Sequence, residues 1–114
     1  MIASPRKGRI LVFGTPFWYP VPGVTYQFLH YLVALRRLGY DLYYIEDSGR
    51  WVYDPVLNDL TPDALRNVQN VAAVLDAHGF SGRWAFRGNY PDGQCYGMSE
   101  GAILRLYREA DAFL

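Results

Sequence analysis

The region from Ile10 to Asp47 constrains the fold more than any other part of the chain. It contains, in order, a short apolar segment, a loop marked by proline and glycine, an amphipathic segment and a second apolar segment. Two neighbouring parallel strands need a crossover of a dozen or more residues, and a helix is the usual one. The right-handed crossover brings the loop after the first strand to the carboxyl edge of the sheet, where open α/β proteins bind ligands. The sequence therefore predicts a βαβ unit whose first loop carries the function.

The helix of this unit is expected from Val24 to Leu38, between strands at Ile10 to Phe13 and Leu42 to Ile45 that should lie side by side. Gly39 supplies the left-handed residue that ends such a helix. Helical spacing predicts that four apolar residues are among the most buried of this helix: Val24, Phe28, Leu32 and Leu35.

The rest of the chain continues the alternation of helix and strand. Thr61 followed by Pro62 predicts the start of a second helix, and Ser99 predicts the cap of a third. A third strand is expected from Arg83 to Arg87, and residues 110–114 resemble the start of a fourth. The inner faces are expected to consist of Leu65, Val68, Ala72 and Leu75 in the second helix and of Ile103, Leu104, Tyr107 and Ala110 in the third.

These elements predict one α/β domain over residues 1–114, with a Rossmann-like three-layer α/β/α fold and a mainly parallel sheet. Because the last element is only beginning at Leu114, we expect a fragment truncated at its C-terminal end. About half of the residues are hydrophobic (51%), which is enough for a real core.

Composition argues against several classes of function. Eleven basic residues balance eleven acidic ones without a basic run, so we expect no nucleic-acid partner. Cys95 is the only cysteine, so neither a disulfide nor a zinc site of cysteines is expected, and a reducing compartment, the cytoplasm, suits it best. The apolar run at Ile10 is too short for a signal peptide or a membrane span.

The loop from Gly14 to Gly23 combines three prolines with the adjacent aromatics Phe17, Trp18 and Tyr19. A stiff loop can hold flat rings toward a ligand at low entropic cost, and such rings stack well on sugar faces. The alternative is that Phe17 and Trp18 cover the sheet edge or meet a missing domain. The loop has neither the G-x-G-x-x-G pattern of dinucleotide-binding proteins nor a Walker motif, so we expect no nucleotide cofactor.

Glu46 and Asp47 follow the second strand directly. An acidic residue at this place holds ribose hydroxyls in dinucleotide-binding domains. Without the glycine pattern, the alternative is a solvated strand end or a cap.

The segment from Gly23 to Leu42, GVTYQFLHYLVALRRLGYDL, resembles the start of a glycosyltransferase of the GT-B fold. In that family a glycine-rich loop precedes a helix of the form leucine-alanine-x-x-leucine, which ends in arginine-glycine-histidine-glutamate-valine before the second strand. The string LVALRRLGYDLYYIE is similar to that ending. The resemblance extends through RWAFRG, DGQCYGMSE and LRLYREADAFL to uncharacterised bacterial glycosyltransferase-like proteins.

The resemblance implies an acceptor-side N-terminal domain that is inactive alone, because in GT-B enzymes the nucleotide sugar binds mainly to a C-terminal domain. Inverting members often have a basic histidine in or near the first loop, but residues 15–27 contain none, so no catalytic residue is assigned. The residues implied to contact a small-molecule acceptor, in one cleft, are Thr15, Trp18, Tyr19, Gly23, Thr25, Gln27, Glu46 and Asp47. Two alternatives stay open: a non-catalytic module that binds a ligand or a protein, and a degenerate domain for a nucleotide cofactor.

Overall fold

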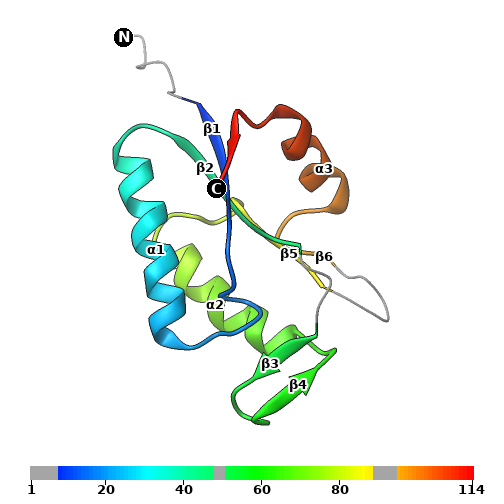
Figure 1. Ribbon diagram of the computed structural model, residues 1–114. Helices are drawn as coiled ribbons and strands as arrows, with labels where there is room; N and C mark the ends of the chain where they lie inside the picture. Colours follow the sequence, from blue (N-terminus) through cyan, green and yellow to red (C-terminus); the bar gives the residue numbers. More distant parts are fainter. Residues whose placement is uncertain (1–7, 48–50, 89–94) are drawn as a thin grey trace.

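A computed structural model of the chain describes residues 8–47, 51–88 and 95–114. Its main sheet has five strands in the order β6-β5-β2-β1-β7 (Figure 1). Four of them are parallel: β1 (Arg9–Phe13), β2 (Asp41–Glu46), β5 (Trp84–Arg87) and β7 (Ala112–Phe113). The short β6 (Cys95–Tyr96) pairs antiparallel with β5. The predicted mainly parallel α/β architecture is confirmed, including the adjacent first two strands and the start of a fourth parallel strand.

The helices cover both faces of this sheet. The helices α1 (Pro22–Arg37) and α2 (Leu65–Ala77) lie on one side, and α3 (Glu100–Glu109) lies on the other (Figure 1). Side chains alternate along a strand, so Ile10 and Val12 of β1 join the core under α1 and α2, whereas Leu11 between them joins the core under α3. The same alternation carries through β2 and β5, which gives the sheet two apolar faces.

The burial predicted for α1 is partly wrong. Its buried residues are Thr25, Leu29 and Leu32, whereas Val24, Phe28 and Leu35 are only half-buried. The predicted stripe follows one flank of the buried face, because the helix is rotated so that the line through Thr25 and Leu29 meets the sheet. Phe28 and Leu35 still pack against the edge of the core. Gly39 has the predicted left-handed conformation, with φ of 99°.

The segment before α2 contains a hairpin that the sequence did not predict. Its strands are β3 (Val52–Asp54) and β4 (Asp59–Thr61), which pair antiparallel. The predicted helix start at Thr61 is wrong, since α2 begins at Leu65 after an Ala64 cap. Thr61 instead ends β4, and its hydroxyl accepts a hydrogen bond from the Asp63 backbone N–H at 3.1 Å.

The inner faces of the later helices also differ in detail. In α2, Leu65 is exposed and Ala72 half-buried, and the buried residues are Asn67, Val68, Val71 and Leu75. In α3, Ser99 is the predicted cap and accepts the Ala102 N–H at 3.1 Å. Ile103 and Leu106 are buried there, Tyr107 and Ala110 are half-buried, and Leu104 is exposed, because the helix is rotated so that the line through Ile103 and Leu106 meets the sheet.

Candidate functional site

The loop after β1 folds back over the carboxyl end of β2, where Glu46 holds it. The Glu46 side chain is 3% exposed. Its Oε2 accepts the Phe17 backbone N–H at 2.6 Å and the Tyr44 hydroxyl at 2.8 Å, and its Oε1 accepts the Trp18 N–H at 3.0 Å. Burial raises the pKa of this carboxyl to about 7, although the three donors oppose the shift. Glu46 is therefore a buried cap on the loop rather than a solvated strand end.

Asn67 of α2 also holds the loop in place, through hydrogen bonds from its side chain. Its side chain is 1% exposed, and its Nδ2 donates to the Phe17 carbonyl at 2.9 Å and to the Tyr53 carbonyl at 2.8 Å. The Tyr53 N–H in turn donates to the Trp18 carbonyl at 2.9 Å. The backbone N–H and C=O groups of Phe17 and Trp18 are thus all hydrogen-bonded, which ties the loop to β2, α2 and the hairpin.

The three adjacent aromatics of the loop have different surroundings. Phe17 is completely buried and packs against Tyr44, Trp84 and Phe86. Trp18 is half-buried, and Tyr19 is 39% exposed. The Tyr19 ring lies 6.0 Å from the Trp18 ring and 5.1 Å from the Tyr53 ring. The structure thus makes Phe17 a core residue and leaves an aromatic strip of Trp18, Tyr19 and Tyr53 at the surface.

Asp47 leaves β2 on the opposite face of the sheet, toward α3. Its carboxylate accepts two hydrogen bonds from Arg87, each 2.7 Å long, and the Tyr107 hydroxyl donates to it at 2.8 Å. Burial alone would raise the pKa of Asp47, but these bonds outweigh it and leave the pKa below its usual value. The structure therefore does not bring Glu46 and Asp47 into the one cleft expected from the sequence.

The other implied contact residues lie around the loop and the start of α1. Thr15 is exposed, and its carbonyl accepts the Tyr19 N–H at 2.7 Å. Gly23 and Gln27 are exposed in the first turns of α1, and Gly23 has no neighbouring atom within 4 Å of the position of a β-carbon. Thr25 is buried against the core. Thr15, Trp18 and Tyr19 thus share the loop surface, whereas Thr25 and Glu46 lie beneath it.

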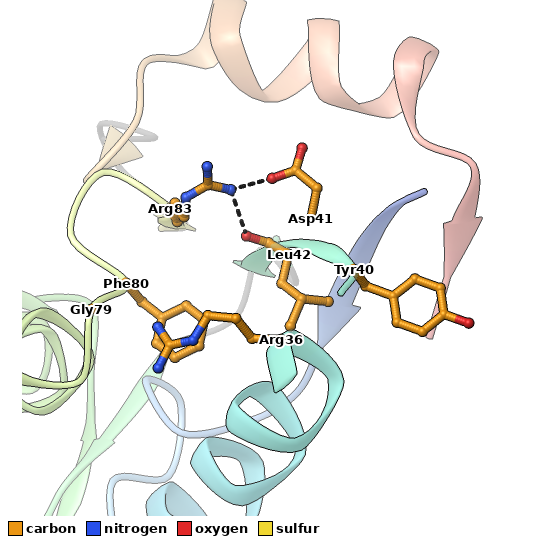
Figure 2. A pocket seen from close by; sticks show the side chains of 7 residues that line it. All are labelled: Arg36, Tyr40, Asp41, Leu42, Gly79, Phe80 and Arg83. Carbon is orange, nitrogen blue, oxygen red and sulfur yellow. Dashed lines mark hydrogen bonds and ion pairs between the residues drawn. The ribbon is translucent and has the colours of Figure 1, made fainter. Parts of the chain in front are cut away.

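A hollow of about 200 Å³ lies at the opposite, amino edge of the sheet, lined by Arg36, Tyr40, Asp41, Leu42, Gly79, Phe80 and Arg83 (Figure 2). Arg36 lies over the Phe80 ring and donates to the His78 carbonyl at 2.9 Å. Arg83 donates to Asp41 and to the Leu42 carbonyl. Since α1 and α2 both end here, these arginines neutralise helix carboxyl ends and a buried acid. We assign no ligand to this hollow.

Three residues that organise the carboxyl edge were missed from the sequence: Tyr53, Asn67 and Arg87. Asn67 had a visible signal, because it is a polar residue beside apolar ones on the inner face of a helix. The separation of Glu46 from Asp47 also had a visible signal, since alternation along β2 places neighbouring residues on opposite faces of the sheet. Tyr53 had none, because the segment around it has no clear period.

The described residues contain no group of histidine, cysteine and acidic side chains that could hold a metal ion. No helix in the part of the chain that the structure describes is long and apolar enough to cross a membrane. Comparisons with protein-family models, with curated proteins and with solved structures found no match.

Proposed function

We propose that the chain is the acceptor-side N-terminal domain of a GT-B-type glycosyltransferase and that it works with a second domain that binds a nucleotide sugar. The observation that carries this proposal is the aromatic strip of Trp18, Tyr19 and Tyr53, held at the carboxyl edge of a parallel sheet by Glu46 and Asn67. Flat rings that are held in this way and are only partly buried suit the apolar face of a sugar or another flat acceptor.

The order of the strands supports a Rossmann-like three-layer fold. The parallel strands lie in the order β5-β2-β1-β7, which is third-second-first-fourth along the chain. Dinucleotide-binding domains begin with this order, and their ligands bind outside the carboxyl ends of the strands where the order reverses. Here the reversal lies between β1 and β7, so the loop that follows β1 is in a suitable position for a substrate.

The contacts of Glu46 favour an acceptor over a nucleotide at this edge. A carboxylate that holds ribose hydroxyls must be open to the ligand, whereas Glu46 is buried and already accepts three hydrogen bonds. The loop also lacks the glycines that allow a pyrophosphate to approach. We therefore assign the donor site to another domain.

We also propose that the protein works in the cytoplasm, since a reducing compartment suits the free thiol of Cys95.

The test is sugar transfer by the protein expressed from the natural reading frame. With a panel of nucleotide sugars and acceptors, Trp18→Ala and Tyr19→Ala are expected to reduce kcat/KM for the acceptor by the equivalent of roughly 1 to 3 kcal/mol, with less effect on donor hydrolysis, because each removes one stacked ring. Tyr31→Ala is the matched control, since Tyr31 is an exposed aromatic on α1 outside the strip.

Unchanged acceptor kinetics in both strip variants would contradict the proposed site. If the wild-type protein transfers no sugar and hydrolyses no donor, the glycosyltransferase proposal fails as a whole. A strip that then binds a protein or a small ligand would make the chain a non-catalytic binding module.

A further inference from the structure

The hairpin of β3 and β4 has three large apolar side chains at its surface. Val56 in the turn is 72% exposed, Leu57 beside it is 59% exposed, and Leu60 of β4 is 52% exposed. Figure 1 shows the hairpin at the lower end of the view, away from the main sheet. Leu60 lies opposite Tyr53 in the strand register, so these three residues, the hairpin patch, adjoin the aromatic strip. Single exposed apolar residues are ordinary, whereas several gathered on one small element indicate a surface that another molecule covers.

The turn of the hairpin holds Val56 and Leu57 in a fixed position. The Asp54 carboxylate accepts the Val56 N–H at 2.8 Å and the Leu57 N–H at 3.3 Å. The Asp54 carbonyl accepts the Asn58 N–H at 2.7 Å. Arg66 of α2 in turn donates to both carboxylate oxygens of Asp54, at 3.1 and 3.2 Å. Because these N–H groups are already bonded, a partner can exclude water from the turn without leaving them unsatisfied, and the fixed turn lowers the entropic cost of binding.

The hydrogen bonds along the hairpin favour a partner that binds through side chains rather than as an added strand. On β4, the Leu60 N–H donates to the Asp59 carboxylate at 2.7 Å. On β3, the Tyr53 N–H donates to the Trp18 carbonyl, and the Tyr53 carbonyl accepts a bond from Asn67. A strand that adds to a sheet needs a row of free backbone groups along the edge, whereas an amphipathic helix binds with its apolar side chains. The hairpin patch therefore suits a helix.

The charged residues of the hairpin segment are acidic. Residues 51–65 contain Asp54, Asp59 and Asp63 and neither lysine nor arginine. Asp54 is paired with Arg66, whereas Asp59 and Asp63 are exposed. Acidic residues beside an apolar surface complement a partner that has basic residues beside its own apolar side chains. They oppose docking on the anionic cytoplasmic leaflet of a membrane. The patch is also far smaller than the roughly 20 to 30 residues that each side of a stable dimer interface contributes.

We infer that the hairpin patch is a docking surface for a basic amphipathic helix of a partner protein. The apolar side chains of that helix cover Val56, Leu57 and Leu60, and its lysine and arginine side chains lie against Asp59 and Asp63. The inference goes beyond the proposed function and does not depend on it, because the contact needs neither a donor nor an acceptor sugar. A patch of this size predicts a weak, reversible complex whose association is accelerated by electrostatic attraction.

The test is amide chemical-shift mapping of the chain by NMR, with two synthetic helical peptides as probes. One peptide has leucines on one face and lysines on the other, and its counterpart has glutamate in place of every lysine. We expect the lysine peptide to shift the Val56, Leu57 and Leu60 amides at micromolar concentration, and to bind more weakly as salt rises to about 0.5 M. The glutamate peptide should cause no such shift.

Three variants separate the patch from a general attraction to positive charge. Leu57→Ala is expected to weaken binding of the lysine peptide by roughly fivefold to tenfold, because it removes apolar area from the contact. Its matched control, Leu104→Ala, changes an exposed leucine on α3 and should leave the affinity unchanged. The double variant Asp59→Asn and Asp63→Asn keeps the oxygen that accepts each backbone N–H but removes both charges, so it should reduce the salt dependence of binding.

Equal binding of the two peptides, shifts that do not gather on the hairpin, or an unchanged affinity in Leu57→Ala would overturn the inference. Binding of the hairpin to phosphatidylcholine vesicles without binding of the peptide would overturn it in favour of a membrane. Dimerisation of the chain that Leu57→Ala abolishes would overturn it in favour of a second copy. None of these measurements involves sugar transfer, so failure of the docking surface and failure of the glycosyltransferase proposal are separate results.

Discussion

The Glu46 carboxyl accepts hydrogen bonds from the Phe17 and Trp18 backbone amides and from the Tyr44 hydroxyl, and burial raises its pKa to about 7. Its proton is therefore held by the folded state and lost by the unfolded state over the pH range between the two pKa values. Over that range the folded state binds more protons, so the free energy of unfolding must fall as the pH rises. The contribution of Asp47 to stability has the opposite pH dependence. Its pKa is lowered in the folded state, so its carboxylate stabilises the fold above the pKa of the unfolded state, and this stabilisation is lost as the pH falls.

We expect the free energy of unfolding of the wild-type chain to fall by about 2 to 3 kcal/mol between about pH 5 and about pH 8 because of Glu46. Urea unfolding at a series of pH values measures it. The difference between the wild type and Glu46→Gln isolates this residue, and Asp63→Asn should follow the wild type. A stability that rises with pH in the wild type relative to Glu46→Gln would show that the carboxyl is stabilised in its charged form.

A second residue-level prediction concerns the two glycines that flank the first loop. A β-carbon at Gly14 would lie 2.6 Å from the Phe28 ring, whereas one at Gly23 meets nothing within 4 Å. Gly14→Ala should therefore destabilise the chain by about 1 to 3 kcal/mol through overpacking, and Gly23→Ala should stabilise it by about 0.5 to 1 kcal/mol through helix propensity. Thermal unfolding of the pair measures both, and equal effects would mean that β1 and α1 do not approach this closely.

At the level of elements, the loop, β2, α2 and the hairpin form one hydrogen-bonded unit in which Asn67 is the junction. The βαβ part of this unit was predictable, because apolar spacing and Gly39 mark its strands and helix in the sequence. The hairpin was not. Its strands have three residues each, and exposed Val56, Leu57 and Leu60 hide any alternation. Its position depends on the bond between Tyr53 and Trp18, which no local pattern encodes.

Asn67→Ala should destabilise the chain by about 2 to 4 kcal/mol, because it leaves two carbonyls without their donor and opens a cavity. Asn70→Ala is the matched control on the same helix, since Asn70 is exposed, and it should be neutral or slightly stabilising. Denaturant unfolding compares the two variants. Equal stabilities would mean that Asn67 does not join the loop to the hairpin.

At the level of the whole molecule, the two faces of the sheet separate the two acids that the sequence placed together. Glu46 faces α1, α2 and the aromatic loop, and Asp47 faces α3. The candidate site is consequently a surface at the carboxyl edge, built from loop and hairpin, and not a cleft between carboxylates. Sequence patterns predicted that the site lies at the carboxyl edge and on the loop. Which of the loop and strand residues are buried and which form the surface depends on packing between distant segments, which no local pattern encodes.

The most direct measurement of this account is amide chemical-shift mapping of the chain with phenyl glycosides, with NAD and with FAD as separate probes. The account predicts that the glycosides shift the amides of Thr15, Trp18, Tyr19 and Tyr53, that Tyr19→Ala weakens this effect, and that neither dinucleotide causes a specific shift. Shifts confined to α3 or to the amino edge, or micromolar binding of NAD or FAD at the loop, would contradict it.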